Sequence, residues 1–191
     1  MLGTRDPSRE SVQEWVKERG SAAAAGTFEE TARFADLVVL ATLWAGTENA
    51  IRLAGADNLA DKIVIDVTNP LSFESMPPTL ALAGTDSGGE QVQRWLPASR
   101  VVKAFNTVGS QHMVDPDFPG GPPDMGMCGD DDSARHTVEE LLVAFGWGVI
   151  DLGSMQAARY LEPLAMIWIL HMLHTGNGDF AFRMLRTRGQ D

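Results

Sequence analysis

The sequence predicts an α/β fold built on a doubly wound, mostly parallel β-sheet. Short uncharged apolar runs, such as 37–41 and 63–65, are typical of strands buried on both faces. Segments with helical periodicity alternate with these runs, as expected for a parallel sheet covered by helices. Two runs end abruptly in polar residues, at Asn69-Pro70 and at Asn106-Thr107. Because ligands bind at the carboxyl edge of such sheets, these endings also indicate a binding site.

The elements follow in order along the chain. Asp6 is a good N-cap and Pro7 suits a first turn, so we expect a helix to begin there. Thr27 and Glu30 have the spacing of a capping box and predict a second short helix. The remaining pattern predicts helices at 47–53 and 88–96, and strands at 37–41, 62–67, 100–104, 125–128 and 147–152. After the strand at 125–128 a further helix is expected, because Val138, Leu141, Leu142 and Phe145 have the spacing of one helix face.

The chain changes character after residue 153. From Met155 onward it is helical, and it is apolar almost all round between Leu161 and Leu173, with a break or kink expected at Pro163. A helix without a polar face needs cover on every side. We therefore expect residues 1–153 to form the sheet domain, and the helical segment 154–191 to pack against it and against a second copy of the chain.

Composition excludes several classes of function. The formal net charge of −11 argues against nucleic acid or an anionic membrane as a partner, because both would be repelled. Cys128 is the single cysteine, so no intrachain disulfide can form, and its apolar surroundings favour an inert thiol. No signal peptide or long apolar span is evident, which predicts a cytoplasmic location.

The beginning of the sequence lacks one part of a complete dinucleotide-binding fold. Such a Rossmann-type domain starts with a strand, a G-x-G-x-x-G turn and a helix, and its first strand lies in the middle of the sheet. Here Met1 to Pro7 reads as the end of a second strand and the loop after it. We expect Met1 to be an internal methionine of a longer chain; the alternative is a natural truncation that has lost ordinary cofactor binding. Either way, a gap between neighbouring strands is expected.

The loop after the first predicted strand holds candidate phosphate ligands. An arginine at this point accommodates the 2′-phosphate of NADP, whereas an acidic residue would select NAD. Thr4 offers a hydroxyl and Arg5 a planar guanidinium, with Ser8 as a weaker candidate. The alternative is that Arg5 is an ordinary surface residue.

Two further groups of candidate ligands follow later strands. Ala41, Thr42 and Leu43 come after the LVVL run and are expected near the nicotinamide ribose, where a small residue allows close approach. Asn69, Pro70 and Asn106 end two adjacent strands, and amides at such a place can hold a carboxamide or a planar ring. Each Asn could instead simply close its turn. Trp44 could stack on a ring or cover the core.

Dedicated catalytic and metal-binding motifs are not evident. His171 and His174 share a helix face, but no third ligand has a suitable spacing, so packing roles are favoured. No paired-carboxylate or Ser-His-Asp pattern stands out. We assign no catalytic residue and no metal ligand from the sequence.

Six motifs occur in an order that resembles one family. They are GTRDP (3–7), LVVLAT (37–42), DVTNPL (66–71), VVKAFNTVG (101–109), CGDD (128–131) and ARYLEPLAMIWI (158–169). Together they are similar to the NADPH-dependent coenzyme F420 reductases, with the oxidoreductase domain of the STEAP metalloreductases as a more distant resemblance. The family resemblance implies a Rossmann domain with a small helical C-terminal part, often dimeric, and hydride transfer between NADP(H) and a deazaflavin.

The resemblance also implies roles for the candidate residues. Thr4 and Arg5 would bind the 2′-phosphate, Ala41 and Thr42 the nicotinamide side, and Asn69 with Asn106 the place where the two rings meet. The absence of the glycine-rich turn and the bulky Leu43-Trp44 pair depart from the family pattern. Two alternatives stay open: a reductase of a small imine or carbonyl, for which Lys103 or His112 would have to supply a proton, and a non-catalytic interaction module.

Overall fold

The computed structural model describes residues 1–185 and 187. Its centre is a five-stranded sheet in the order β3-β4-β7-β8-β9. The strands span Leu37–Leu40, Ile63–Asp66, Arg100–Lys103, Asp124–Gly129 and Gly148–Asp151. β3, β4 and β7 are parallel, β8 pairs antiparallel with β7, and β9 is parallel to β8. The prediction of a mostly parallel α/β sheet is therefore confirmed.

Helices cover both faces of this sheet. One face carries α2 (Phe28–Phe34), α3 (Trp44–Ala54), α4 (Gly88–Trp95) and α6 (Ala158–Thr175), and the other carries α5 (Asp132–Ala144). Residues alternate between the two cores: Val64 and Val101 pack on the first face, whereas Ile65 and Val102 pack on the second. This alternation is the expected result of the two-residue period of a strand.

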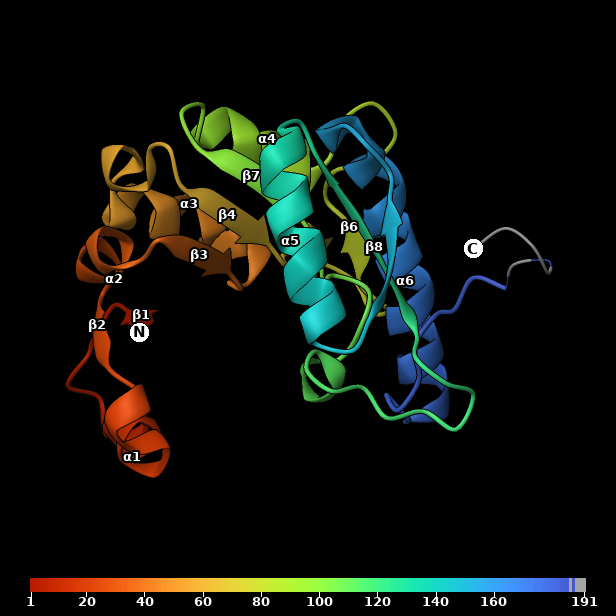
Figure 1. Ribbon diagram of the computed structural model, residues 1–191, viewed down its shortest axis with the longest axis horizontal. Coiled ribbons are helices and arrows are strands. Elements are labelled where there is room, and N and C mark those ends of the chain that lie inside the picture. Colours follow the sequence, from red (N-terminus) through yellow and green to blue (C-terminus); the bar gives the residue numbers. More distant parts are fainter. Residues whose placement is uncertain (186, 188–191) are drawn as a thin grey trace.

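A separate pair of short strands lies at the amino-terminal end. β1 (Leu2–Thr4) is parallel to β2 (Ala25–Thr27), and these strands pair with each other but not with the larger sheet. With α1 (Glu10–Arg19), they form one end of the molecule, and α6 lies at the other end (Figure 1). The expected gap between neighbouring strands is present as a cavity of about 790 Å³ between β1 and β3.

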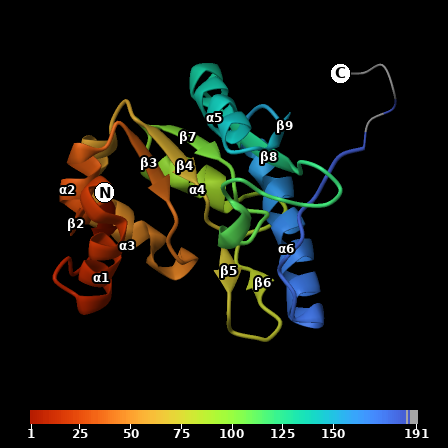
Figure 2. The same ribbon diagram turned by 60° about the horizontal axis from the view of Figure 1, so that its bottom comes forward.

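Smaller elements complete the chain. A two-stranded antiparallel pair, β5 (Leu71–Ser72) and β6 (Thr79–Leu80), follows β4 and lies beside α6 (Figure 2). Short 3-10 helices are η1 (Gly20–Ala22), η2 (Ala56–Leu59), η3 (Ser110–His112) and η4 (Met155–Ala157). None of the helices in the described part of the chain is long and apolar enough to span a membrane.

Two local predictions require correction. α1 begins at Glu10 rather than at Asp6, because the Asp6 carboxylate accepts hydrogen bonds from the backbone and side chain of Ser8 and so closes a turn. α6 is one continuous helix through Pro163, which lies in its second turn. By contrast, the predicted Thr27 and Glu30 capping box is present, with both reciprocal hydrogen bonds formed.

Candidate functional site at the carboxyl edge of the sheet

The carboxyl ends of β1, β3, β4 and β7 carry the sequence-predicted binding residues. In a doubly wound sheet these ends share one edge, and the loops that follow them face a bound ligand. Thr4 and Arg5 end β1, and residues 41–43 follow β3. Residues 67–70 follow β4, and residues 104–107 follow β7.

The Arg5 side chain, which directly follows β1, is exposed and unpaired within the described residues. Its exposed guanidinium forms no hydrogen bond or ion pair with any residue of 1–185 or 187. Thr4 uses its hydroxyl oxygen to accept the Asp6 backbone N–H at 3.3 Å, and Ser8 donates its hydroxyl to Asp6 at 2.6 Å. The Ser8 hydrogen bonds hold the pKa of Asp6 below its ordinary value. Ser8 is thus committed to Asp6, whereas the guanidinium groups of Arg5 and Arg9 form no ion pair with the described residues.

The loop after β3 leads directly into α3. Thr42 and Thr47 share a hydroxyl–hydroxyl hydrogen bond of 2.8 Å, and Thr47 also donates to the Leu43 carbonyl at 3.1 Å. This bonding fixes the turn after Ala41 and leaves the Leu43 side chain 78% exposed. Trp44 stacks on Trp95, with ring centroids 5.5 Å apart, so its ring covers the core. Of the two roles considered for Trp44, the structure therefore favours the packing role.

Asn69 and Asn106 meet across the ends of β4 and β7. Asn69 donates its side-chain N–H to the Asn106 backbone carbonyl at 2.8 Å, and Asn106 donates to Asn69 Oδ1 at 3.1 Å and to the Leu161 carbonyl at 3.1 Å. Asn106 Oδ1 is buried and has no hydrogen-bond partner among the described residues. A buried acceptor without a donor is uncommon and marks a place where a bound group can supply one.

The backbone before Asn106 is held in an unusual conformation. Phe105 has a φ of +62°, in the left-handed region that non-glycine residues rarely occupy. Its ring is 95% buried and packs against Phe145 with centroids 6.1 Å apart. The core therefore holds a turn that costs about 1–3 kcal/mol. This turn follows β7 and immediately precedes Asn106.

A buried ionic cluster lies beneath the two asparagines. Lys103 is fully buried, and its Nζ lies 2.7 Å from Asp66 Oδ2, 2.8 Å from the Thr68 carbonyl and 3.1 Å from Glu162 Oε1. Burial alone would lower the pKa of Lys103, but the carboxylates of Asp66 and Glu162 outweigh that effect and raise it. The lysine is therefore charged and ties β4, β7 and α6 together.

Glu162 also occupies the amino terminus of α4. Its carboxylate accepts the backbone N–H groups of Gly88 at 3.0 Å and Gly89 at 2.9 Å. A Cβ on Gly88 would lie 3.1 Å from that carboxylate, so glycine permits the close approach. The positive end of the helix dipole thus balances the second carboxylate of the cluster. These two glycines bind an internal carboxylate rather than a cofactor phosphate.

The comparisons with known proteins agree with this geometry. Residues 2–70 match the family model described as "NADP oxidoreductase coenzyme F420-dependent". A crystal structure from Arthrobacter sp. FB24, described provisionally as an F420-dependent NADP reductase, is 41% identical, covers 96% of this chain and 87% of its own, and superposes with a TM-score of 0.90. The chain belongs to the family of F420-dependent NADP oxidoreductases.

Two curated proteins are more distant relatives. The F420-dependent NADP reductase of Methanocaldococcus jannaschii is 28% identical over 86% of this chain and 75% of its own length. Metalloreductase STEAP3 of Rattus norvegicus is 36% identical over 58% of this chain, but the match spans 21% of that protein. The resemblance to both families is therefore confirmed. The chain is accordingly an NADP-dependent oxidoreductase with a Rossmann-type fold.

Sequence reasoning about this oxidoreductase missed the Lys103 cluster and the Phe105 turn. From the sequence, Lys103 was considered only as a distant proton donor. In the structure its ammonium is fully used by Asp66, the Thr68 carbonyl and Glu162. His112 contacts Asp179 at 3.1 Å and packs on Phe118, so it too is engaged elsewhere. A charged residue in an otherwise apolar strand run is the signal that could have indicated an internal ion pair.

Cys128 and His171 are also withdrawn from chemistry. Burial raises the pKa of the Cys128 thiol to about 12, which keeps it protonated and inert. His171 packs edge-on against Phe180. Within residues 1–185 and 187, no group of three His, Cys, Asp or Glu side chains is arranged to hold a metal ion.

Proposed function

We propose that this chain orients NADP(H) against coenzyme F420, or another planar two-electron acceptor, for direct hydride transfer. The observation that carries the proposal is the reciprocal Asn69–Asn106 pair, with its unpartnered Asn106 Oδ1, at the carboxyl ends of two adjacent parallel strands. The cofactors supply the redox chemistry, and the protein supplies position and a dry environment. A side-chain proton donor is not required for such a transfer.

The free Arg5 supports NADP as the nucleotide. In a chain of net charge −11, a phosphate needs a local cation, and Arg5 is free of ion pairs in the described part of the protein. Thr4 and, more weakly, Ser8 lie in the same loop. On this proposal Ala41, Thr42 and Leu43 line the nicotinamide side, and Pro70 flanks the site of ring contact. The carrier of selectivity is the guanidinium, which suits a phosphate dianion.

The test of the nucleotide site is a titration with NADPH and, separately, NADH, followed by tryptophan fluorescence. NADPH is expected to bind more tightly, and Arg5→Ala is expected to weaken NADPH binding about tenfold or more, as for loss of a charged hydrogen bond. Arg19→Ala, at the far end of α1, is the matched control. Equal affinities for NADPH and NADH, or an Arg5→Ala variant that binds NADPH like wild type, would contradict the assignment.

The test of the acceptor is single-turnover reduction of F420 by NADPH, followed by loss of the absorbance of the oxidised deazaflavin. Asn106→Ala is expected to slow the transfer about a hundredfold, the scale of removing one positioning contact. Its NADPH affinity should change much less, because Arg5 lies on another strand. An unchanged rate would remove the asparagine pair from the function. We find no structural feature that favours an imine or carbonyl acceptor.

We further propose that the chain has two parts and that the second part also contributes to the site. Residues 1–153 form the NADP-binding domain and 154–191 the helical segment, of which 186 and 188–191 lie outside the described residues. α6 also serves the site, since Leu161 contacts Asn106 and Glu162 contacts Lys103.

The outward face of α6 leaves Tyr160, Ile167 and Leu170 exposed, which supports homodimer formation through this helix. Light scattering tests this: Ile167→Lys should convert a dimer to a monomer, and a monomeric wild type would refute it.

A further inference from the structure

The orientation of the Asn106 side chain is set by hydrogen-bond acceptors on two sides of it. The Asn69 amide N–H donates to the Asn106 backbone carbonyl at 2.8 Å, which fixes the orientation of the Asn69 side chain. The Asn106 amide then donates to Asn69 Oδ1 and to the Leu161 carbonyl, each at 3.1 Å. An amide turned over would place its oxygen against these two acceptors. Asn106 Oδ1 therefore points away from both, without a donor among the described residues.

The Leu161 carbonyl is the one partner of this amide that comes from α6. It lies 55 residues further along the chain than Asn106, so its place depends on how the helix packs. The N···O distance of 3.1 Å is already near the upper end of the usual range, about 2.7–3.2 Å. An outward shift of this part of α6 would break the bond. The direction of Asn106 Oδ1 thus depends on where α6 is held.

Glu162 is the next residue of α6 and holds the helix at this level. Its side chain is 1% exposed. One carboxylate oxygen lies 2.9 Å from the Gly89 nitrogen and 3.1 Å from Lys103 Nζ, and the other lies 3.0 Å from the Gly88 nitrogen. These donors belong to the amino terminus of α4 and to the end of β7. The single side chain therefore fixes α6 against two other elements.

The backbone of α6 lacks one internal bond at the same place. Pro163 follows Glu162 and has no backbone N–H, so the usual helical bond to the Arg159 carbonyl is not made. The Arg159 side chain pairs with Glu90 on α4 at 2.6 Å, but both side chains are partly exposed. The buried contact of Glu162 is therefore the one that acts directly on the neighbouring Leu161 carbonyl.

A glutamate suits the three donors around it, whereas a glutamine does not. The two carboxylate oxygens accept from both glycine N–H groups and from the ammonium of Lys103. A glutamine has one acceptor oxygen, and its NH₂ group would meet at least one of the three donors. Lys103 would still contact Asp66 at 2.7 Å, so Glu162→Gln removes the anchor without leaving the lysine unpaired.

We propose that Glu162 is a positioning residue for hydride transfer, which acts through the Leu161 carbonyl on the orientation of Asn106. Its carboxylate holds α6 so that both N–H groups of the Asn106 amide are bonded within the protein and Oδ1 is presented to the bound nicotinamide. The control of the amide by Glu162 stands on these contacts alone. Its effect on hydride transfer rests on the proposed function.

The first test reads the Asn106 amide directly in the full chain, without cofactor. Labelling with ¹⁵N-asparagine marks the side chains of Asn49, Asn58, Asn69, Asn106 and Asn177 in the NMR spectrum. The pair of signals lost in Asn106→Ala identifies the amide of interest. Glu162→Gln is expected to speed exchange of these amide protons with solvent about tenfold, the scale for loss of one hydrogen bond. An unchanged exchange rate would overturn the proposal.

Glu90→Gln is the matched control for this measurement. It also removes a carboxylate contact between α4 and α6, the one to Arg159, but leaves Glu162 in place. The Asn106 amide should exchange as in wild type. Equal acceleration by both variants would indicate a general loosening of α6 and overturn the proposal. Should Glu162→Gln fail to fold, Glu162→Asp is read in the same way, because its shorter side chain cannot reach the glycines and Lys103 together.

A double-mutant cycle tests the route of the effect on hydride transfer. In single-turnover reduction of F420 by saturating NADPH, Glu162→Gln is expected to slow the transfer about tenfold, with NADPH affinity changed less than about twofold. If Glu162 acts through Asn106, the double variant is no slower than Asn106→Ala alone. Additive losses of rate, or a loss of NADPH affinity without a loss of rate, would overturn the proposal.

The outcome for Glu162 is separable from that for the proposed function. Faster exchange of the Asn106 amide in Glu162→Gln, in a protein whose wild type does not reduce F420, would retain the contact and contradict its role in the transfer. A wild-type transfer that depends on Asn106 but is unchanged in Glu162→Gln would retain the proposed function and overturn the positioning role.

Discussion

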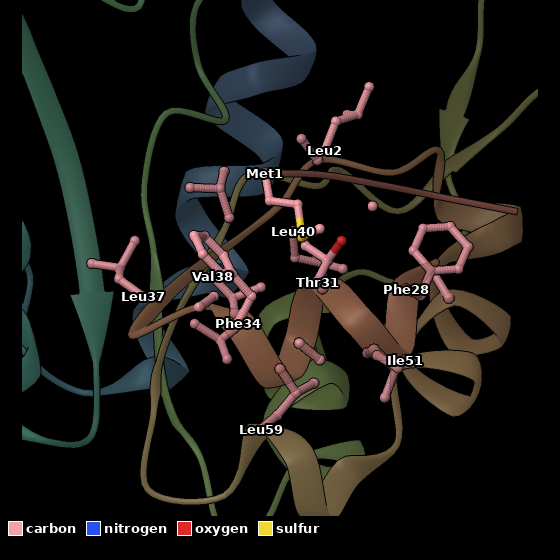
Figure 3. Close-up of a pocket in the computed structure, with 18 of the residues that line it drawn as sticks. Met1, Leu2, Phe28, Thr31, Phe34, Leu37, Val38, Leu40, Ile51 and Leu59 are labelled. Atoms are coloured by element: carbon pink, nitrogen blue, oxygen red, sulfur yellow. The ribbon is translucent and has the colours of Figure 1, made fainter. Parts of the chain in front are cut away.

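Two regions of the molecule, one around β4 and β7 and the other between β1 and β3, differ in how completely their polar and apolar groups are matched. At β4 and β7 a fully buried lysine contacts two carboxylates and a carbonyl, and the helices cover both faces. At β1 and β3 an apolar cavity separates two strand edges, and Val39 remains 55% exposed. The first region is closed by long-range contacts, whereas the second keeps an open apolar cavity (Figure 3).

The difference separates the region that stabilises the fold from the loop of Arg5, which we propose binds the nucleotide. Charged groups inside the closed region are stable only because every partner is present. In the open region, by contrast, Arg5 forms no ion pair with the described residues and Val39 is exposed. We therefore expect substitutions in the closed region to change the free energy of unfolding, and substitutions in the open region to change binding.

The largest expected effect is that of Lys103→Met. Loss of the ammonium leaves the carboxylates of Asp66 and Glu162 buried without their cation. We expect the free energy of unfolding to fall by about 3–5 kcal/mol, as for other broken buried ion pairs. Urea unfolding followed by circular dichroism measures it. Lys17→Met on the exposed side of α1 is the control and should change stability by less than about 0.5 kcal/mol. Similar midpoints for the two variants would show that the cluster does not hold the closed region together.

Matched truncations compare the two regions directly. Val102→Ala removes buried methyl groups from the second core and is expected to cost about 2 kcal/mol. Val39→Ala makes the same change in the register row of Val102 but on the open edge, and should cost about 0.5 kcal/mol or less. Denaturant unfolding of the chain, without any ligand, measures both changes in the free energy of unfolding. A cost at Val39 as large as that at Val102 would mean that the β3 edge is already packed.

The parts of the fold that sequence predicted depend on local pattern. Uncharged runs gave the strands, and Thr27 with Glu30 gave a helix start, because strand burial and capping involve residues close in sequence. The antiparallel direction of β8 was not predicted, since an apolar run carries no information about its direction. The prediction that Asp6 caps a helix was wrong, because its carboxylate accepts hydrogen bonds from Ser8 and closes a turn instead.

In the candidate site, too, features set by local sequence were predicted and contacts between distant residues were not. Polar residues at the ends of strands indicated where Asn69 and Asn106 would lie, because parallel strands share an edge. The contacts that Lys103 makes with Asp66 and Glu162 join residues far apart in the chain, so no spacing announces them. The Phe105 turn was equally hidden, because its backbone conformation is imposed by packing against Phe145. Whether the predicted ligands bind NADP stays a prediction for the titrations above.

The smallest expected effect concerns the link between α4 and α6. Arg159 donates two hydrogen bonds to Glu90, at 2.6 and 2.8 Å, and these lower the pKa of Glu90. A lowered carboxyl pKa stabilises the fold above the unfolded value, roughly 4.3, and this contribution is lost as pH falls through the folded value.

Glu90→Gln should therefore cost about 1 kcal/mol near pH 7, as for a bidentate pair, and progressively less below about pH 4. Thermal unfolding across pH measures the difference from wild type, with the exposed Glu48→Gln as control. A difference that stayed constant with pH would assign the effect to packing of the side chain rather than to its charge. Glu90 directly follows the two glycines that bind Glu162, so a constant difference would leave the buried cluster as the ionic link between α4 and α6.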